Sequence, residues 1–181
     1  MDKCARSKLF SPLLLTAAIF LCGSKAFGSC DFYFDSGPKV VFNGAGAECK
    51  KARFNGAVLT FYVNYPGGEV LSGRAIDGSV VVDRVRKISS DLVRGDVSIK
   101  YMSLASSVDG VEFYEAGDRK LFRFKGVDGQ RVYVGGGDVS EGNRAFQGLE
   151  ILYQFSKGYV NFKVIDDFVL GVLTSRVAIG N

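Results

Sequence analysis

The amino-acid sequence predicts an all-β fold, a single antiparallel β-sandwich or barrel of about ten to twelve strands that allows one short helix. Asn-Gly or Asp-Gly occurs at residues 43–44, 55–56, 77–78, 109–110 and 128–129. These dipeptides favour the tight turns of β-hairpins, because both turn residues take positive φ angles. Between the turns, apolar and polar residues alternate with period two. The 23 glycines and the 13% aromatic content suit hairpins better than a helical bundle.

The alternation locates the individual strands. Leu59, Phe61 and Val63 form one face of an expected strand, and the residues between them form the other face. Strands are expected at residues 31–36, 38–43, 57–65, 69–76, 79–87, 96–104, 111–116, 119–125, 130–135, 149–156 and 159–165, with a last apolar run at 168–178.

Two stretches leave alternatives open. Residues 87–94 are compatible with a short helix or with a turn. Residues 143–155 fit a helix or a strand, but Gly148 disfavours a helix. Leu149, Ile151 and Tyr153 alternate with their neighbours, so a strand is the favoured interpretation.

The first 28 residues have the features of a secretory signal peptide. Basic side chains near the N-terminus precede an apolar segment at residues 13–21, which is too short to span a bilayer as a helix. Ala26 and Gly28 are the small residues expected before a cleavage site, which predicts cleavage between Gly28 and Ser29. Residues 29–181 then form a single secreted β-rich domain without a transmembrane anchor. An uncleaved N-terminal anchor is the alternative.

Cleavage leaves two cysteines, Cys30 and Cys49, and an exported chain with two cysteines predicts one disulfide between them. The alternative is a lipoprotein attached through Cys30, but Phe27 fits a bacterial lipobox poorly. No Asn-x-Ser/Thr sequon is present, which favours a bacterial envelope or secreted protein over a eukaryotic one. The expected location is therefore exported, either periplasmic or extracellular.

Charge and composition exclude several functions. The absence of histidine excludes His-based catalysis and His-ligated metal sites. The full chain carries a net charge of +4, and removing the four basic residues and one acid of residues 1–28 leaves 19 basic against 18 acidic side chains. Because nucleic-acid binding requires a concentrated basic surplus, nucleic acid is not an expected partner. No complete phosphate loop or metal motif occurs, so neither a cofactor nor a metal is expected.

One candidate binding surface lies on the expected strand at residues 119–125. Three basic residues share one face of it: Arg119, Arg123 and Lys125. A two-residue turn at residues 128–129 pairs this strand with the next one and places Phe124 opposite Tyr133. The resulting hairpin presents a positively charged surface for a ligand, with Tyr133 as a fourth candidate residue. An ordinary solvated sheet face is the alternative.

These observations predict a non-enzymatic, exported β-domain that binds a protein or glycan partner. One alternative is a β-barrel carrier of a small apolar ligand. Another is a carboxylate-based hydrolase, because two suitably spaced acids can hydrolyse glycosides without histidine. The available acids are Glu112, Glu115, Glu150, Asp166 and Asp167.

Overall fold

Antiparallel β-strands make up most of the fold, which confirms the predicted class. The computed structural model describes residues 28–35, 37–73, 79–87, 93–136, 139–156 and 161–180. The strands are β1 (Ser29–Tyr33), β2 (Lys39–Asn43), β3 (Arg53–Phe54), β4 (Leu59–Asn64), β5 (Val70–Leu71), β6 (Ser79–Lys87), β7 (Ser103–Val108), β8 (Val111–Ala116), β9 (Arg119–Lys125), β10 (Arg131–Gly135), β11 (Ser140–Phe146), β12 (Leu149–Phe155) and β13 (Val177–Gly180). The helical segments are α1 (Gly46–Cys49), α2 (Arg94–Ser98), the 3₁₀ turn η1 (Ile99–Tyr101) and α3 (Phe162–Arg176).

A large sheet of ten strands forms the body of the molecule. Its strand order is β3-β4-β6-β12-β11-β10-β9-β8-β7, with β5 paired to β4. Strands β7 to β12 form a continuous up-and-down meander, in which each strand pairs with the next. The order is open, with β3 and β7 at its edges, so the described strands form no closed barrel.

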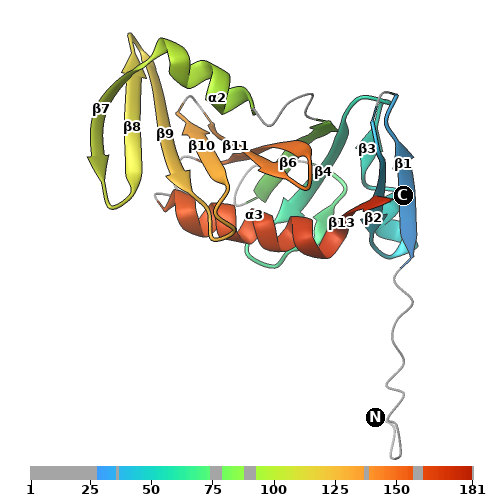
Figure 1. The fold of residues 1–181 in the computed structure, drawn as a ribbon. Helices are drawn as coiled ribbons and strands as arrows, with labels where there is room; N and C mark the ends of the chain where they lie inside the picture. Colours follow the sequence, from blue (N-terminus) through green and yellow to red (C-terminus); the bar gives the residue numbers. More distant parts are fainter. Residues whose placement is uncertain are drawn as a thin grey trace, which may run out of the picture.

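The two faces of this sheet have different covers. Helix α3 runs along one face of the sheet, and the short helix α2 lies over the other (Figure 1). The face toward α3 is largely apolar, with Val132, Ile151 and Phe155 buried on it. Because successive residues of a strand point to opposite faces, each strand of the meander contributes to both the α3 side and the α2 side.

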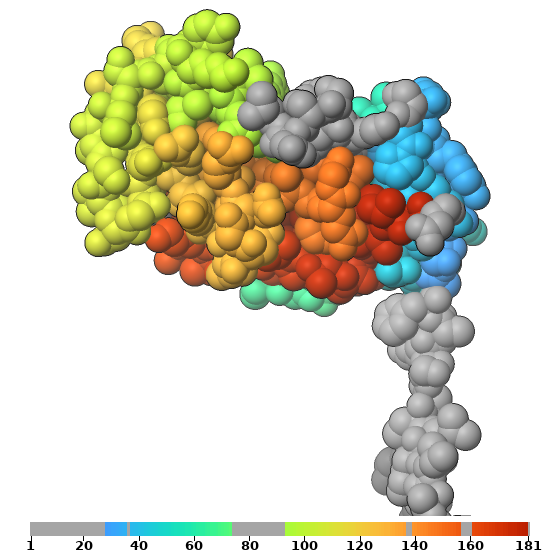
Figure 2. Space-filling view, viewed as in Figure 1, coloured from blue at the N-terminus to red at the C-terminus, as the bar shows by residue number. Residues whose placement is uncertain are grey.

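A small sheet of order β1-β2-β13 packs at one end of the large sheet. Phe42 of β2 meets Phe61 of β4 edge to face, with ring centroids 5.0 Å apart. The predicted disulfide is present: Cys30 of β1 is bonded to Cys49 of α1, with their Cα atoms 6.0 Å apart. Figure 2 shows β1 at one end of the molecule and the β7–β8 end at the other.

The C-terminal helix corrects the sequence prediction of a strand at residues 159–165, of which 159 and 160 lie outside the described residues, and it contains most of the apolar run at 168–178. Helix α3 covers most of that stretch, and only Val177–Gly180 forms a strand. The Asn161 side chain accepts a hydrogen bond from the backbone N–H of Val164 and so caps the helix. The helical stripe of Ile165, Val169, Val172 and Leu173 is buried. Apolar and polar residues also alternate around residue 162, and this alternation led to the wrong prediction of a strand.

Two further predictions differ from the structure. Residues 96–104 were expected to form a strand, but α2 and η1 occupy residues 94–101 and β7 begins only at Ser103. Strand β11 was not expected, although the prediction of a strand rather than a helix at residues 149–156 is confirmed. Strands β11 and β12 are joined by Gln147 and Gly148, both with positive φ, so an uncommon Gln-Gly dipeptide forms this turn.

A buried ion-pair network joins α3 to the sheet. Arg144 of β11 and Asp166 of α3 both have fully buried side chains, and Nη1 lies 2.6 Å from Oδ2. Asp128 from the β9–β10 loop also pairs with Arg144, and the Tyr153 hydroxyl donates to Asp166 Oδ1 at 2.9 Å. Burial raises the pKa of Asp166, and both Arg144 and Tyr153 oppose that increase. Arg144 therefore holds a strand, a helix and a loop together.

No helix in the described parts of the chain is long and apolar enough to cross a membrane. The predicted signal segment lies outside the described residues, except for Gly28 at its end.

Replacing Arg144 with Met should lower the free energy of unfolding by about 3–5 kcal/mol, because the buried Asp166 carboxylate loses its cation. Urea unfolding monitored by circular dichroism measures this cost. Asp167→Asn is the matched control, since Asp167 lies next to Asp166 on α3 but is exposed; it should change stability by no more than about 0.5 kcal/mol. Equal stabilities of the two variants would contradict a structural role for the network.

Candidate functional site

The predicted basic residues do share one face of β9, on the side of the sheet that carries α2. The strand pairing differs by one residue from the expected register. Arg123 lies opposite Tyr133, and Lys125 lies opposite Arg131, because residues 126–130 form a five-residue loop rather than a two-residue turn. The observed register places Tyr133 on the same face as Arg123, and it adds Arg131 to the basic side chains.

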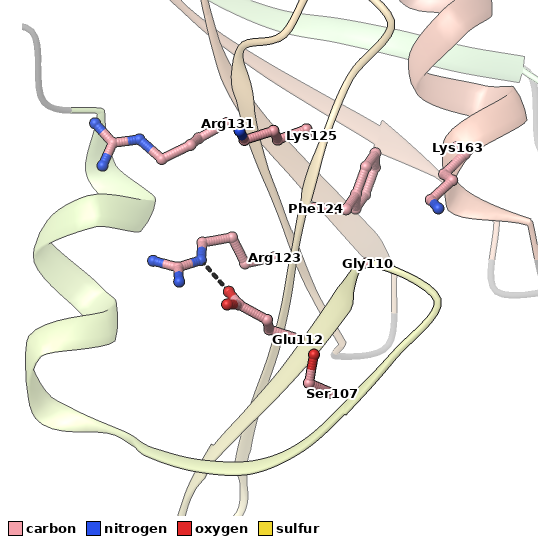
Figure 3. A pocket seen from close by; sticks show the side chains of 8 residues that line it. All are labelled: Ser107, Gly110, Glu112, Arg123, Phe124, Lys125, Arg131 and Lys163. Carbon is pink, nitrogen blue, oxygen red and sulfur yellow. Dashed lines mark hydrogen bonds and ion pairs between the residues drawn. The ribbon is translucent and has the colours of Figure 1, made fainter.

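A pocket of about 600 Å³ lies at this end of the sheet. We call it the large pocket, and eight residues line it: Ser107, Gly110, Glu112, Arg123, Phe124, Lys125, Arg131 and Lys163 (Figure 3). Three of its four basic residues come from β9 and β10, and Lys163 comes from the start of α3. Its volume lies within the range typical of sites for small ligands.

Arg123 is held in a fixed position within the large pocket. Its Nε donates to Glu112 of β8, as the dashed line in Figure 3 shows. Its guanidinium also lies over the Tyr114 ring, 5.3 Å from the centroid. The hydrogen bond from Arg123 lowers the pKa of Glu112, against a smaller opposing effect of burial. Glu112 therefore stays ionised at neutral pH and acts as an acceptor that orients Arg123.

The other basic residues of the large pocket differ in their partners. Arg131 forms an ion pair with Asp96 of α2 at 3.2 Å. Lys163 donates to the backbone carbonyl of Asp109 at 3.1 Å and has no ion pair with another described residue. The Lys125 ammonium group is exposed and has no ion pair or hydrogen bond with any other described residue. Positive charge thus remains for a ligand.

Helix α2 is docked on the same face through its first turn. The N–H groups of Arg94 and Gly95 donate to Glu150 Oε1 at 2.8 Å and to Asn143 Oδ1 at 2.9 Å. Gly95 lies directly on the Tyr133 ring, where an added Cβ would come within 2.1 Å of Cγ. The Tyr133 hydroxyl donates to Asp96, and burial, followed by this hydrogen bond, raises the pKa of Tyr133 to about 12.

A second pocket of about 210 Å³ lies between α2 and the sheet. We call it the small pocket, and its lining is made of Arg94, Gly95, Ser98, Arg119, Leu121, Tyr133, Gly135, Glu141 and Asn143. Arg94 pairs with Glu141 at 3.6 Å. The Arg119 guanidinium is exposed and has no ion pair or hydrogen bond with another described residue.

The four candidate residues are therefore divided between two neighbouring pockets. Arg123 and Lys125 line the large pocket, whereas Arg119 and Tyr133 line the small one. Sequence reasoning missed Arg131 because the assumed turn was too short. It also missed Lys163, because the residues around it had been assigned to a strand, and no local signal links them to β9.

The acids proposed for a hydrolase do not come together in the structure. Asp166 is buried against Arg144, and Asp167 is exposed one residue further along α3. Glu150 is bound to the first turn of α2, and Glu112 to Arg123. Among the described residues, no group of three or more acids or cysteines is arranged to hold a metal ion.

Comparisons with known proteins give no match: no family model, no curated protein and no solved structure is significantly similar to this chain. Function is therefore inferred from the residues that line the two pockets and from their chemistry.

The contact between Tyr133 and Asp96 should depend on pH. Because folding raises the pKa of Tyr133 from 10 to about 12, the stabilisation is fully present below pH 10 and is lost as the pH rises through 12. At neutral pH, Tyr133→Phe should lower the free energy of unfolding by about 1–2 kcal/mol. Ultraviolet titration should show that the variant lacks a phenol that ionises near pH 12. A Tyr133 phenol that ionises near pH 10 would contradict the docked position of α2.

Proposed function

We propose that this protein binds an acidic glycan through the large pocket and performs no catalysis. The supporting observation is the convergence of four basic side chains on one pocket, with Glu112 as the sole carboxylate in its lining. After the expected cleavage, the chain as a whole has nearly balanced charge, so this pocket concentrates a local positive potential. Such a potential attracts anionic groups and orients them.

The chemistry of the pocket favours binding over hydrolysis. A glycosidase needs two carboxyl groups across a cleft, one of them protonated to act as the general acid. Only Glu112 faces the large pocket among the described carboxylates, and Arg123 lowers its pKa. A carboxylate held in this way is a poor proton donor at neutral pH. The open sheet likewise lacks the closed interior that a β-barrel carrier of apolar ligands requires.

The lining favours a glycan over a protein partner. Protein interfaces are anchored by aromatic and other apolar side chains that fill complementary pockets. The large pocket instead presents charged groups and the Ser107 hydroxyl, and its one aromatic residue, Phe124, is only 3% exposed. Carboxylate or sulfate groups together with sugar hydroxyls complement such a lining.

We further propose that the protein acts outside the cytoplasm, in the periplasm or the extracellular space. The disulfide between Cys30 and Cys49 supports this location, because such bonds persist in oxidising compartments. The signal-like sequence at residues 1–28 supports it as well.

Reversing the charge of Lys125 tests the proposed function. Lys125→Glu should weaken binding to a heparin oligosaccharide about tenfold or more in isothermal titration calorimetry, and higher salt should weaken binding of the unaltered protein. Lys120→Glu is the matched control, because Lys120 is exposed on the same strand but points to the opposite face of the sheet. It should bind heparin normally.

Three results would contradict the proposal. One is the absence of heparin binding by the unaltered protein, and another is equal weakening by Lys125→Glu and Lys120→Glu. The third is equally tight binding of duplex DNA, which would show attraction to any polyanion.

A further inference from the structure

We infer that the small pocket is a second subsite for the same acidic glycan, so that the ligand is a linear chain bound along β9. This inference rests on the proposed function of the large pocket and extends it. It assigns a role to the Arg119 guanidinium, which faces the small pocket and has no ion pair or hydrogen bond with another described residue.

The two pockets adjoin along one strand. Leu121 lines the small pocket and Arg123 lines the large one, and these residues are consecutive on the same face of β9. Consecutive positions on one strand face are about 7 Å apart, so the pockets share a boundary. A linear glycan that extends along β9 from one pocket therefore enters the other.

The unpaired charges lie at the two ends of this path. Lys125 and Arg119 are both exposed, and neither has an ion pair with another described residue. The two residues are six positions apart on an extended strand, so their Cα atoms are about 20 Å apart. Between them, Arg123 is already held by Glu112. A ligand that pairs with both cations must therefore carry at least two acidic groups and extend along most of β9.

The balance of charge over the combined surface favours a polyanion. The two pockets contain six basic residues: Arg94, Arg119, Arg123, Lys125, Arg131 and Lys163. Their linings contain two acids, Glu112 and Glu141, and each is already paired with an arginine. Arg131 pairs with Asp96 of α2, so Arg119, Lys125 and Lys163 remain without an ion pair among the described residues. A ligand with a single acidic group would leave most of this positive charge uncompensated.

Chain length then determines which residues matter for binding. A disaccharide is too short to reach from Lys125 to Arg119, whereas an octasaccharide is long enough. Occupying two linked subsites raises the local concentration of the second group, so the octasaccharide should bind at least about 100-fold more tightly than the disaccharide. Arg119 should contribute only to binding of the longer ligand.

The experiment measures dissociation constants of heparin disaccharide and octasaccharide for the full protein and three variants, by titration calorimetry. Lys125→Gln should weaken binding of both ligands about fivefold, and Arg119→Gln should weaken only the octasaccharide by a similar factor. Lys120→Gln, on the opposite face of β9, should change neither. All three side chains are exposed, and circular dichroism and thermal melting verify that each variant is folded.

The outcomes separate this inference from the proposed function. If Lys125→Gln weakens both ligands while Arg119→Gln leaves the octasaccharide unchanged, the second subsite is wrong and the proposed function stands. If the protein binds neither oligosaccharide, or if Lys125→Gln has no effect on either, the proposed function itself fails. If a poly-glutamate peptide binds as tightly as the octasaccharide, the ligand class is acidic peptide rather than glycan, which overturns the inference.

Discussion

The pairing of Arg144 with Asp166 is the contact on which the rest of the structure depends. A guanidinium without solvent contact must be paired, because leaving it uncompensated costs several kcal/mol. Its partners come from α3 and from the β9–β10 loop, two segments that no local preference would bring together. Burying one arginine in β11 therefore ties helix α3 and the β9–β10 loop to the large sheet.

The same strand positions the opposite face of the sheet. Asn143, next to Arg144 in β11, points to the α2 side and accepts the Gly95 N–H. Helix α2 is thereby held over Tyr133, and one wall of the small pocket is formed. Because the β9–β10 register follows from the five-residue loop, Arg123 lies beside Tyr133, and Lys125 beside Arg131. The basic surface thus depends on the β9–β10 loop, whose Asp128 pairs with the buried Arg144.

The sequence predicted what local chemistry determines. The bounds of β8 and β9 were predicted to the residue, because hairpin turns and alternation are encoded in neighbouring positions. The two-residue turn predicted at residues 128–129 was wrong, because Asp128 lies in a longer loop and pairs with the distant Arg144. The strand predicted at residues 159–165 was wrong, because the sequence there fits both an alternating strand pattern and the apolar stripe of helix α3. The shared face of Arg123 and Lys125 followed from their spacing on one strand. The positions of Glu112, Arg131 and Lys163 beside them depend on strand pairing and on α3, which no local pattern reveals.

The claim that an acidic glycan occupies the α2 side of β8, β9 and β10 is tested most directly by mapping backbone amide chemical shifts during titration with heparin octasaccharide. The largest shifts should fall on Arg119–Lys125, on β10, on the first turn of α2 and on Lys163 at the start of α3, with little change in the small sheet of β1, β2 and β13. Saturating shifts concentrated on the small sheet, or none on β9, would contradict the assignment of the binding surface.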